Sequence, residues 1–87
     1  MRYTVLWRPS AEQRLAELWV AGPDRAAVAA AANAIDRTLA NDPDTKGEAR
    51  SGSTRILVED PLAVYFRVSE PDRLVTVRAV WRWRTAR

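Results

Sequence analysis

The last strand-like run of the sequence carries the side chains best suited to binding an anion. Residues 74–84 alternate like a half-buried β-strand, with apolar side chains on one face and arginines on the other. On this reading, Arg78, Arg82 and Arg84 share the water-facing side. Because guanidinium groups pair bidentately with phosphates and carboxylates, the pattern predicts an anionic partner, which could be RNA, DNA or an acidic protein segment.

Two tryptophans lie on the apolar face of the same run. Trp81 is predicted to join the core, whereas Trp83 lies near the strand end and is predicted to be partly exposed. A tryptophan beside arginines could stack on a nucleobase. It could equally pack on the first helix or be covered by a partner.

The composition restricts the chemistry that the chain can perform. The absence of Cys and His excludes cysteine nucleophiles, His-based triads and typical zinc sites. We therefore expect no metal and no cofactor. One of the fourteen basic residues is Lys46 and the rest are arginine, for a net charge of +3. This bias suits phosphate or carboxylate recognition, although a high genomic G+C content would produce the same bias.

The length and hydropathy predict a single domain over residues 1–87, with a small but adequate core. No apolar run approaches the roughly 20 residues of a transmembrane helix. Residues 1–8 lack the apolar region of a signal peptide. The expected location is therefore the cytoplasm, without membrane association.

The first part of the chain predicts a short strand and a helix. Residues 2–8 form the strand, which a proline ends. Ser10 is the expected N-cap of the helix, and Gln13 completes a capping box. The Gly-Pro pair at 22–23 ends this helix.

A second, alanine-rich helix is predicted from Arg25 to about residue 40, with Asp24 as its N-cap. Its small side chains favour close packing against the first helix in an antiparallel hairpin. The buried side of this second helix is expected to consist of Val28, Ala31, Ala32, Ile35 and Leu39.

The rest of the chain predicts a loop over residues 44–53 and then three strands, 54–59, 62–69 and 74–81. The short connections between these strands imply an antiparallel meander. The order is therefore β-α-α-β-β-β, an α+β domain whose antiparallel sheet carries the helical hairpin on one face.

The alternation also predicts which strand residues face the helices. The core-facing set is Ile56, Val58, Leu62, Val64, Phe66 and Val68. The opposite face would gather Arg55, Glu59, Tyr65, Arg67, Arg78 and Arg82. Such a face is either a solvated surface with cross-strand Arg–Glu pairs or a binding surface.

Five segments, in their order and spacing, carry a family pattern: residues 3–12, 35–43, 55–58, 62–68 and 75–80, the last followed by a basic end. In this order they resemble the RelE/ParE superfamily of bacterial toxins. The resemblance implies a small cytoplasmic toxin of a type II toxin–antitoxin, or plasmid stabilisation, system. It also implies a cognate antitoxin that wraps and neutralises the toxin, in a hetero-oligomer or beside a toxin homodimer.

The family has branches that differ in their target. RelE-like members cut mRNA in the ribosomal A site without a metal, ParE-like members inhibit DNA gyrase without being nucleases, and some members show no evident toxicity. The resemblance makes Glu48 a possible general base and Arg82 a charge stabiliser. Cutting members usually carry an arginine where this chain has Ala63, and often a histidine or basic residue followed closely by tyrosine near Arg82 and Trp83.

Because this position is Ala63 and the chain has no histidine, we expect a toxin that acts by binding or has lost catalysis. An active ribosome-dependent mRNA endonuclease is the alternative, and a nucleic-acid-binding module outside toxin–antitoxin systems is a third reading. The expected binding residues are Arg55, Tyr65, Arg67, Arg78, Arg82, Trp83 and Arg84.

Overall fold

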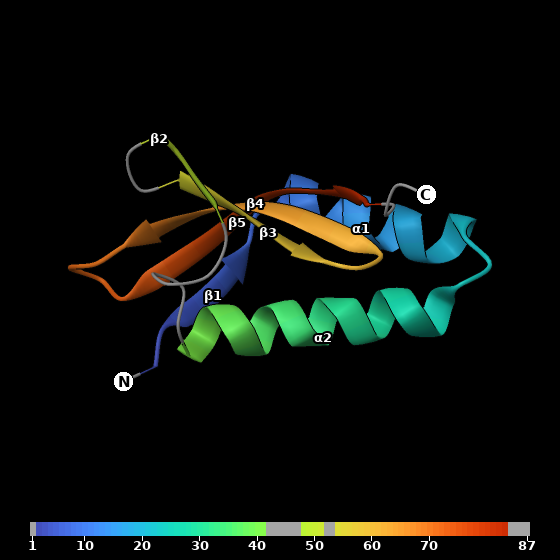
Figure 1. Ribbon diagram of the computed structural model, residues 1–87, viewed down its shortest axis with the longest axis horizontal. Coiled ribbons are helices and arrows are strands. Elements are labelled where there is room, and N and C mark those ends of the chain that lie inside the picture. Colours follow the sequence, from blue (N-terminus) through green and yellow to red (C-terminus); the bar gives the residue numbers. More distant parts are fainter. Residues whose placement is uncertain (1, 42–47, 52–53, 84–87) are drawn as a thin grey trace.

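The computed structural model describes residues 2–41, 48–51 and 54–83, with the backbone alone for 48–51 (Figure 1). The elements are β1 (Thr4–Trp7), α1 (Pro9–Ala21), α2 (Arg25–Asn41), β2 (Glu48–Ser51), β3 (Thr54–Glu59), β4 (Leu62–Ser69) and β5 (Leu74–Arg82). The predicted order β-α-α-β-β-β is confirmed, with one additional strand. That strand, β2, lies within the stretch that was predicted to be a loop. Within the described residues, neither helix is long and apolar enough to cross a membrane.

The strands form one sheet in the order β1-β5-β4-β3-β2. Strands β2 to β5 pair antiparallel with their neighbours, as the predicted meander requires. The sheet is mixed rather than antiparallel throughout, because β1 joins β5 in parallel. The N–H groups of Thr4 and Arg8 donate to the carbonyls of Arg73 and Val77, both at 2.9 Å, at the two ends of this pairing.

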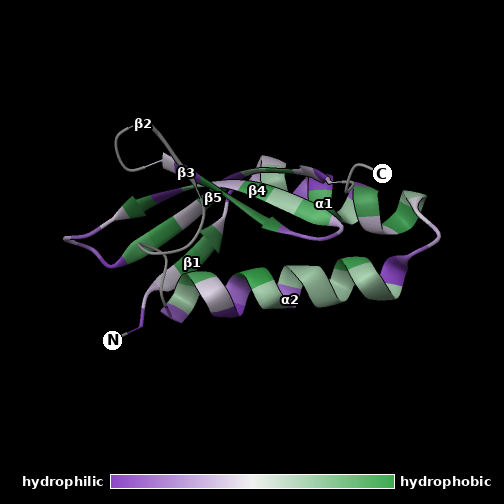
Figure 2. Ribbon diagram, in the orientation of Figure 1, coloured by the Kyte–Doolittle hydropathy of each residue, from purple (hydrophilic) through white to green (hydrophobic). Residues whose placement is uncertain are grey.

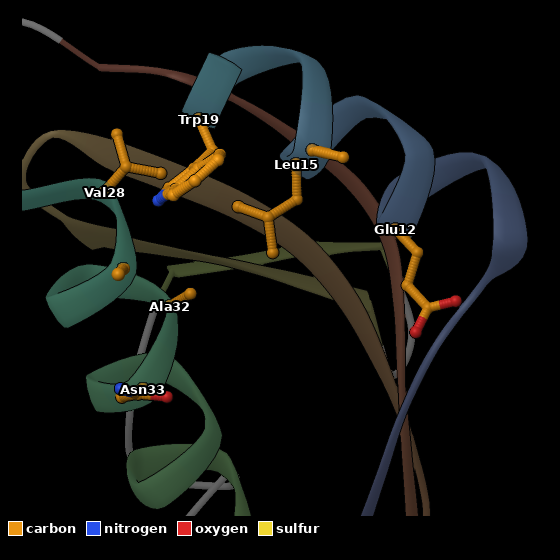
Figure 3. Close-up of a pocket in the computed structure, with 8 residues that line it drawn as sticks. Glu12, Leu15, Trp19, Val28, Ala32 and Asn33 are labelled. Carbon is orange, nitrogen blue, oxygen red and sulfur yellow. The ribbon is translucent and has the colours of Figure 1, made fainter. Parts of the chain in front are cut away.

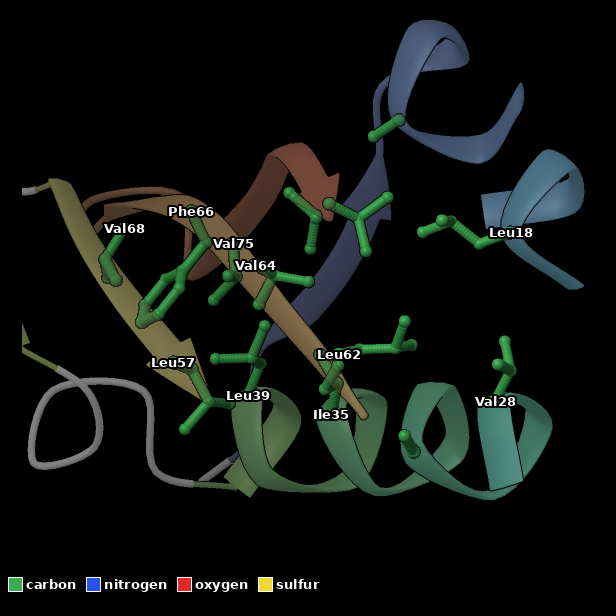
Figure 4. Close-up of a cluster of buried hydrophobic side chains, with 14 residues drawn as sticks. Leu18, Val28, Ile35, Leu39, Leu57, Leu62, Val64, Phe66, Val68 and Val75 are labelled. Carbon is green, nitrogen blue, oxygen red and sulfur yellow. The ribbon is translucent and has the colours of Figure 1, made fainter. Parts of the chain in front are cut away.

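Both helices cover one face of the sheet, where they close the core (Figure 4). Val64 and Phe66 of β4 are fully buried and form the centre of the core. The predicted buried stripe of α2 is confirmed, since Val28, Ala31, Ile35 and Leu39 are buried and Ala32 is partly buried. Figure 2 shows hydrophilic residues concentrated at the β4–β5 turn and at the start of α2.

Helix α1 begins two residues earlier than predicted. Pro9 is its first residue, and Arg8 occupies the N-cap position without a side-chain capping bond. The fixed φ of proline and its missing N–H suit the first position of a helix. The predicted capping box of Ser10 and Gln13 is therefore wrong, because both residues lie inside the helix.

A β-bulge in β5 changes the faces of its last residues. Tyr65 stands opposite Ala79 and Phe66 stands opposite Val77, so Arg78 is an extra residue between the two pairs. Beyond the bulge the alternation is inverted, and Val80 is buried in the core. The prediction of one unbroken alternation through residues 74–84 is therefore wrong from the bulge onward.

The side chains of β3 also point to the faces opposite to those predicted. Leu57 pairs with Val64 and is buried in the core, whereas the side chain of Val58 is 41% exposed. Residues 56–58 are three consecutive apolar residues, so alternation alone cannot decide which of them points inward. The pairing with β4 decides it, because directly opposite residues share a face.

Candidate binding surface on the open face of the sheet

The face of the sheet that points away from α1 and α2 forms a continuous surface across four strands. We call it the open face and define it by the register of the strands. Its members are Thr4, Leu6, Thr54, Ile56, Val58, Ala63, Tyr65, Arg67, Ser69, Leu74, Thr76, Arg78, Ala79 and Trp81. Side chains in cross-strand rows lie about 5 Å apart, which is close enough to form one contact surface.

The end of the open face near the β3–β4 turn is apolar. Val58, Ala63 and Trp81 form one cross-strand row, in which Trp81 is half-buried and Ala63 is 0% exposed. Trp81 was predicted to join the core, but the bulge turns it to the open face. Ala63 is therefore a small side chain in a completely covered position between two larger ones.

The two arginines of the open face lie in its middle and toward its other end. Arg67 is exposed, opposite Thr54 on one neighbouring strand and Thr76 on the other. Arg78 is exposed at the bulge, beside the half-buried Tyr65. These three predicted binding residues lie together on the open face, as expected.

Arg82 lies on the helix side of the sheet, where its guanidinium pairs with Asp24 in the α1–α2 turn. Nη1 donates to Asp24 Oδ2 at 2.8 Å and Nη2 donates to Asp24 Oδ1 at 3.2 Å. Nη2 also donates to the carbonyl of Leu18 at 3.5 Å. The prediction that Arg82 shares a face with Arg78 is wrong, because the bulge separates them.

Gly22 provides the space for this ion pair. A Cβ atom at Gly22 would lie 2.5 Å from Arg82 Nη2 and 2.7 Å from Asp24 Oδ1. The φ of Gly22 is −96°, which any residue can adopt. A side chain at position 22 would therefore displace the ends of Arg82 and Asp24, a constraint of space that the sequence did not reveal.

The other predicted site residues are distributed around the sheet. Arg55 is half-buried and pairs with Phe66, which places it on the helix side instead of the open face. Trp83 is 40% exposed, and its backbone N–H donates to the carbonyl of Pro61 at 2.8 Å. Glu48 is the first residue of β2, opposite Ile56 in the register; its side chain and Arg84 lie outside the described residues.

A second surface, which the sequence did not predict, is a groove between α1 and α2 (Figure 3). The groove has a volume of about 500 Å³, and Leu15, Trp19, Val28 and Ala32 line it. The guanidinium of Arg25 lies 4.9 Å from the ring centre of Trp19. The helices were expected to pack closely along their alanines, but a groove lies between them, with Leu15 and Trp19 of α1 facing alanines of α2.

The described side chains of the open face are of types that are common in binding surfaces. Among the residues that the structure describes, no cluster of three acidic residues could hold a metal ion. The described side chains of the open face include two arginines, two aromatic residues and several aliphatic residues. Tryptophan, tyrosine and arginine are the residues that contribute most often to protein interfaces.

No protein-family profile and no curated protein match the sequence. Its likeness to known proteins lies in the structure. A chain of the toxin–antitoxin complex RelBE2 from Mycobacterium tuberculosis superposes with a TM-score of 0.74 at 19% identity, over 94% of this chain and 92% of that one. The isolated RelE toxin of E. coli superposes with a TM-score of 0.68 at 10% identity, over 97% of this chain and 87% of that one.

The chain has the RelE toxin fold. The resemblance inferred from the order and spacing of the five sequence segments is thereby confirmed at the level of the fold. The match to the RelE fold extends over nearly the whole chain, including the two helices and the sheet.

Proposed function

We propose that this protein is the toxin of a type II toxin–antitoxin system and acts by binding its cellular target, for which DNA gyrase is one candidate, or has lost catalysis. The fold that it shares with the E. coli RelE toxin supports a toxin. The proposed mode of action rests on the ion pair of Arg82 with Asp24. This pair holds Arg82, the expected catalytic cation, on the helix side of the sheet.

Cleavage of RNA through the 2′-hydroxyl needs a base, a cation for the phosphorane and an acid for the leaving oxygen. Glu48 could supply the base. Arg82 is engaged elsewhere, and Ala63 occupies a covered apolar position where the cutting members of the family usually have an arginine. Loss of one charge stabiliser commonly costs a factor of about 10²–10³ in rate, so these residues support binding over cutting.

The expected partner is a cognate antitoxin. A chain with this fold was crystallised in a toxin–antitoxin complex, which supports an antitoxin partner here. The net charge of +3 and the two exposed arginines of the open face favour an acidic antitoxin segment. Such a pair would function in the cytoplasm.

The test is to express the protein without an antitoxin, follow growth and map mRNA ends on translating ribosomes. We expect growth arrest with gyrase-linked DNA breaks and without cuts inside codons. The charge reversal Arg67→Glu with Arg78→Glu should relieve the arrest. The matched reversal Arg14→Glu with Arg37→Glu, on the exposed helix surfaces, should not.

The alternative function is a RelE-type mRNA endonuclease. The observation in its favour is the position of Glu48 in β2, opposite the open-face residue Ile56. Abundant cuts within codons that disappear in Glu48→Gln would establish this alternative and refute the binding toxin.

A further inference from the structure

We propose that the groove between α1 and α2 binds a second copy of this chain, with the two α1 helices antiparallel about a two-fold axis. The inference goes beyond the proposed function, because the groove lies on the helices and the open face points away from them. It is carried by the opposite charges at the two ends of the groove and by the polar groups there that lack partners.

The two ends of the groove carry opposite charges. Glu12 lies at one end of its α1 side and Trp19 at the other, with Leu15 between them (Figure 3). The guanidinium of Arg25 lies over the Trp19 ring, 4.9 Å from its centre. The groove therefore has an anion at one end, a cation at the other and apolar side chains between them.

The polar groups at these two ends are free to bind a ligand. Among the residues that the structure describes, the exposed Glu12 carboxylate has no hydrogen-bond or ion-pair partner. Within the same part of the chain, the indole N–H of Trp19 donates to no acceptor and Arg25 pairs with no carboxylate. Hydrogen bonds between ionised groups are the stronger ones. A matching ligand therefore presents a cation at the Glu12 end and a carboxylate at the Trp19 end.

A second copy of the chain meets this requirement when it runs antiparallel to the first. Glu12 and Trp19 are seven residues apart on α1, which is about two turns and roughly 10 Å, so both lie on one side of the helix. The midpoint between them lies at Leu15 and Ala16. A two-fold axis there brings Glu12 of each copy to Trp19 and Arg25 of the other. The patch is then complementary to itself, as an isologous dimer requires.

The apolar side chains of the groove suit such a contact. Ala16 and Ala29 are exposed and line the groove, and small side chains let a second helix approach closely. Near the axis, Leu15 of one copy packs on Ala16 of the other. Trp19 is 42% exposed, and burial of its ring supplies apolar binding energy of the kind that tryptophan contributes to protein interfaces.

The charge pattern favours a second copy over an acidic segment of another protein. A segment that carries only carboxylates is attracted by Arg25 but repelled by Glu12, whereas an antiparallel copy places opposite charges together at both ends. Because the open face points away from the helices, the dimer leaves both open faces accessible to their own partners.

The experiment measures self-association of the full chain by sedimentation velocity. The protein is studied from about 10 µM to about 1 mM, the range in which weak interfaces associate. We expect a dimer. In ¹⁵N NMR spectra, its formation should shift the backbone amides of Ala16, Ala29 and Ala32 and leave those of Ile56 and Tyr65 unchanged.

Charge reversal tests the antiparallel arrangement. Glu12→Arg and Arg25→Glu should each raise the dissociation constant of the dimer at least about tenfold, because a two-fold interface contains each changed contact twice. An equimolar mixture of the two variants should associate to within about threefold of the wild type, because opposite charges again meet at both ends. Glu17→Arg, on α1 outside the groove, is the control and should leave the dissociation constant unchanged.

Several outcomes would overturn the inference. One is a wild-type protein that stays monomeric at about 1 mM. Another is a dimer that both single variants leave intact. A third is a mixture that fails to restore the dimer although both variants give the amide dispersion of a folded protein. Finally, a monomer whose Ala16 and Ala32 amides shift on addition of a helical peptide with a leucine stripe would assign the groove to a partner helix instead.

Discussion

Arg82 and Asp24, 58 residues apart in sequence, form a two-point ion pair that fastens the end of β5 to the turn between α1 and α2. Both side chains are partly buried, with exposed fractions of 23% and 33%. A two-point geometry fixes the orientation of the guanidinium as well as its position. The pair therefore stabilises the connection between the helical hairpin and the sheet.

The ion pair should contribute measurably to stability. In a double-mutant cycle of Arg82→Ala and Asp24→Ala, we expect a coupling free energy of about 1 kcal/mol, after allowance for solvent screening. The exposed Arg14–Glu17 pair is the control, and its coupling should be about 0.3 kcal/mol. Urea unfolding measures both cycles, and equal couplings would contradict a structural role for Arg82.

Gly22→Ala should destabilise the protein through the same pair. The new methyl group would force apart the guanidinium and carboxylate that lie beside Gly22, at a cost of about 1 kcal/mol, the strength expected for the pair itself. In an Arg82→Ala background the cost should fall below about 0.5 kcal/mol, because the neighbouring groups are then no longer fixed. Thermal unfolding of the wild type, the two single variants and the double variant tests this. An unchanged cost of Gly22→Ala in the Arg82→Ala background would refute the explanation.

The strand register predicts different outcomes for two valines. Val80→Ala should cost about 2 kcal/mol, because the bulge in β5 leaves Val80 buried in the core. Val58→Ala should cost about 0.5 kcal/mol or less, because the pairing of β3 with β4 leaves Val58 largely exposed. Both changes replace a valine in a strand with alanine, so the loss of β-propensity is the same. Denaturant midpoints in the reverse order would contradict the faces assigned to these two residues.

Ala63→Arg should destabilise the fold instead of creating a catalytic cation. Ala63 is completely covered in its row, so an arginine must disrupt its neighbours, at a cost of about 2–3 kcal/mol. Ala79→Arg, at a half-buried position of the same face, is the control and should cost about 1 kcal/mol or less. Calorimetry measures the loss of stability in both variants. An Ala63→Arg protein of normal stability would show that position 63 can hold a cation.

The sequence predicted the architecture because its main signals are local. The Gly-Pro pair at 22–23, the apolar stripe of α2 and the clear alternation of β4 each follow from neighbouring residues. The parallel pairing of β1 and the faces of β3 depend on which strands meet. Those features are set by tertiary contacts, so local patterns did not reveal them.

The candidate site was predicted in part. Tyr65, Arg67 and Arg78 lie on the open face as expected, because β4 alternates regularly and Arg78 precedes the inversion. The prediction placed Arg82 on the wrong face, because one extra residue, Arg78, interrupts the alternation of β5. One signal was present in the sequence: Val80 stood on the predicted water-facing side, which is an unusual place for a large aliphatic residue among arginines.

The parallel pairing of β1 with β5 has a consequence for folding. Strand β1 pairs with a strand from the far end of the domain, so that Thr4 lies beside Leu74. Pairings between such distant segments close late and slow the completion of a fold. The row of the open face that contains Leu6 and Arg67 is therefore expected to be assembled in a late step of folding.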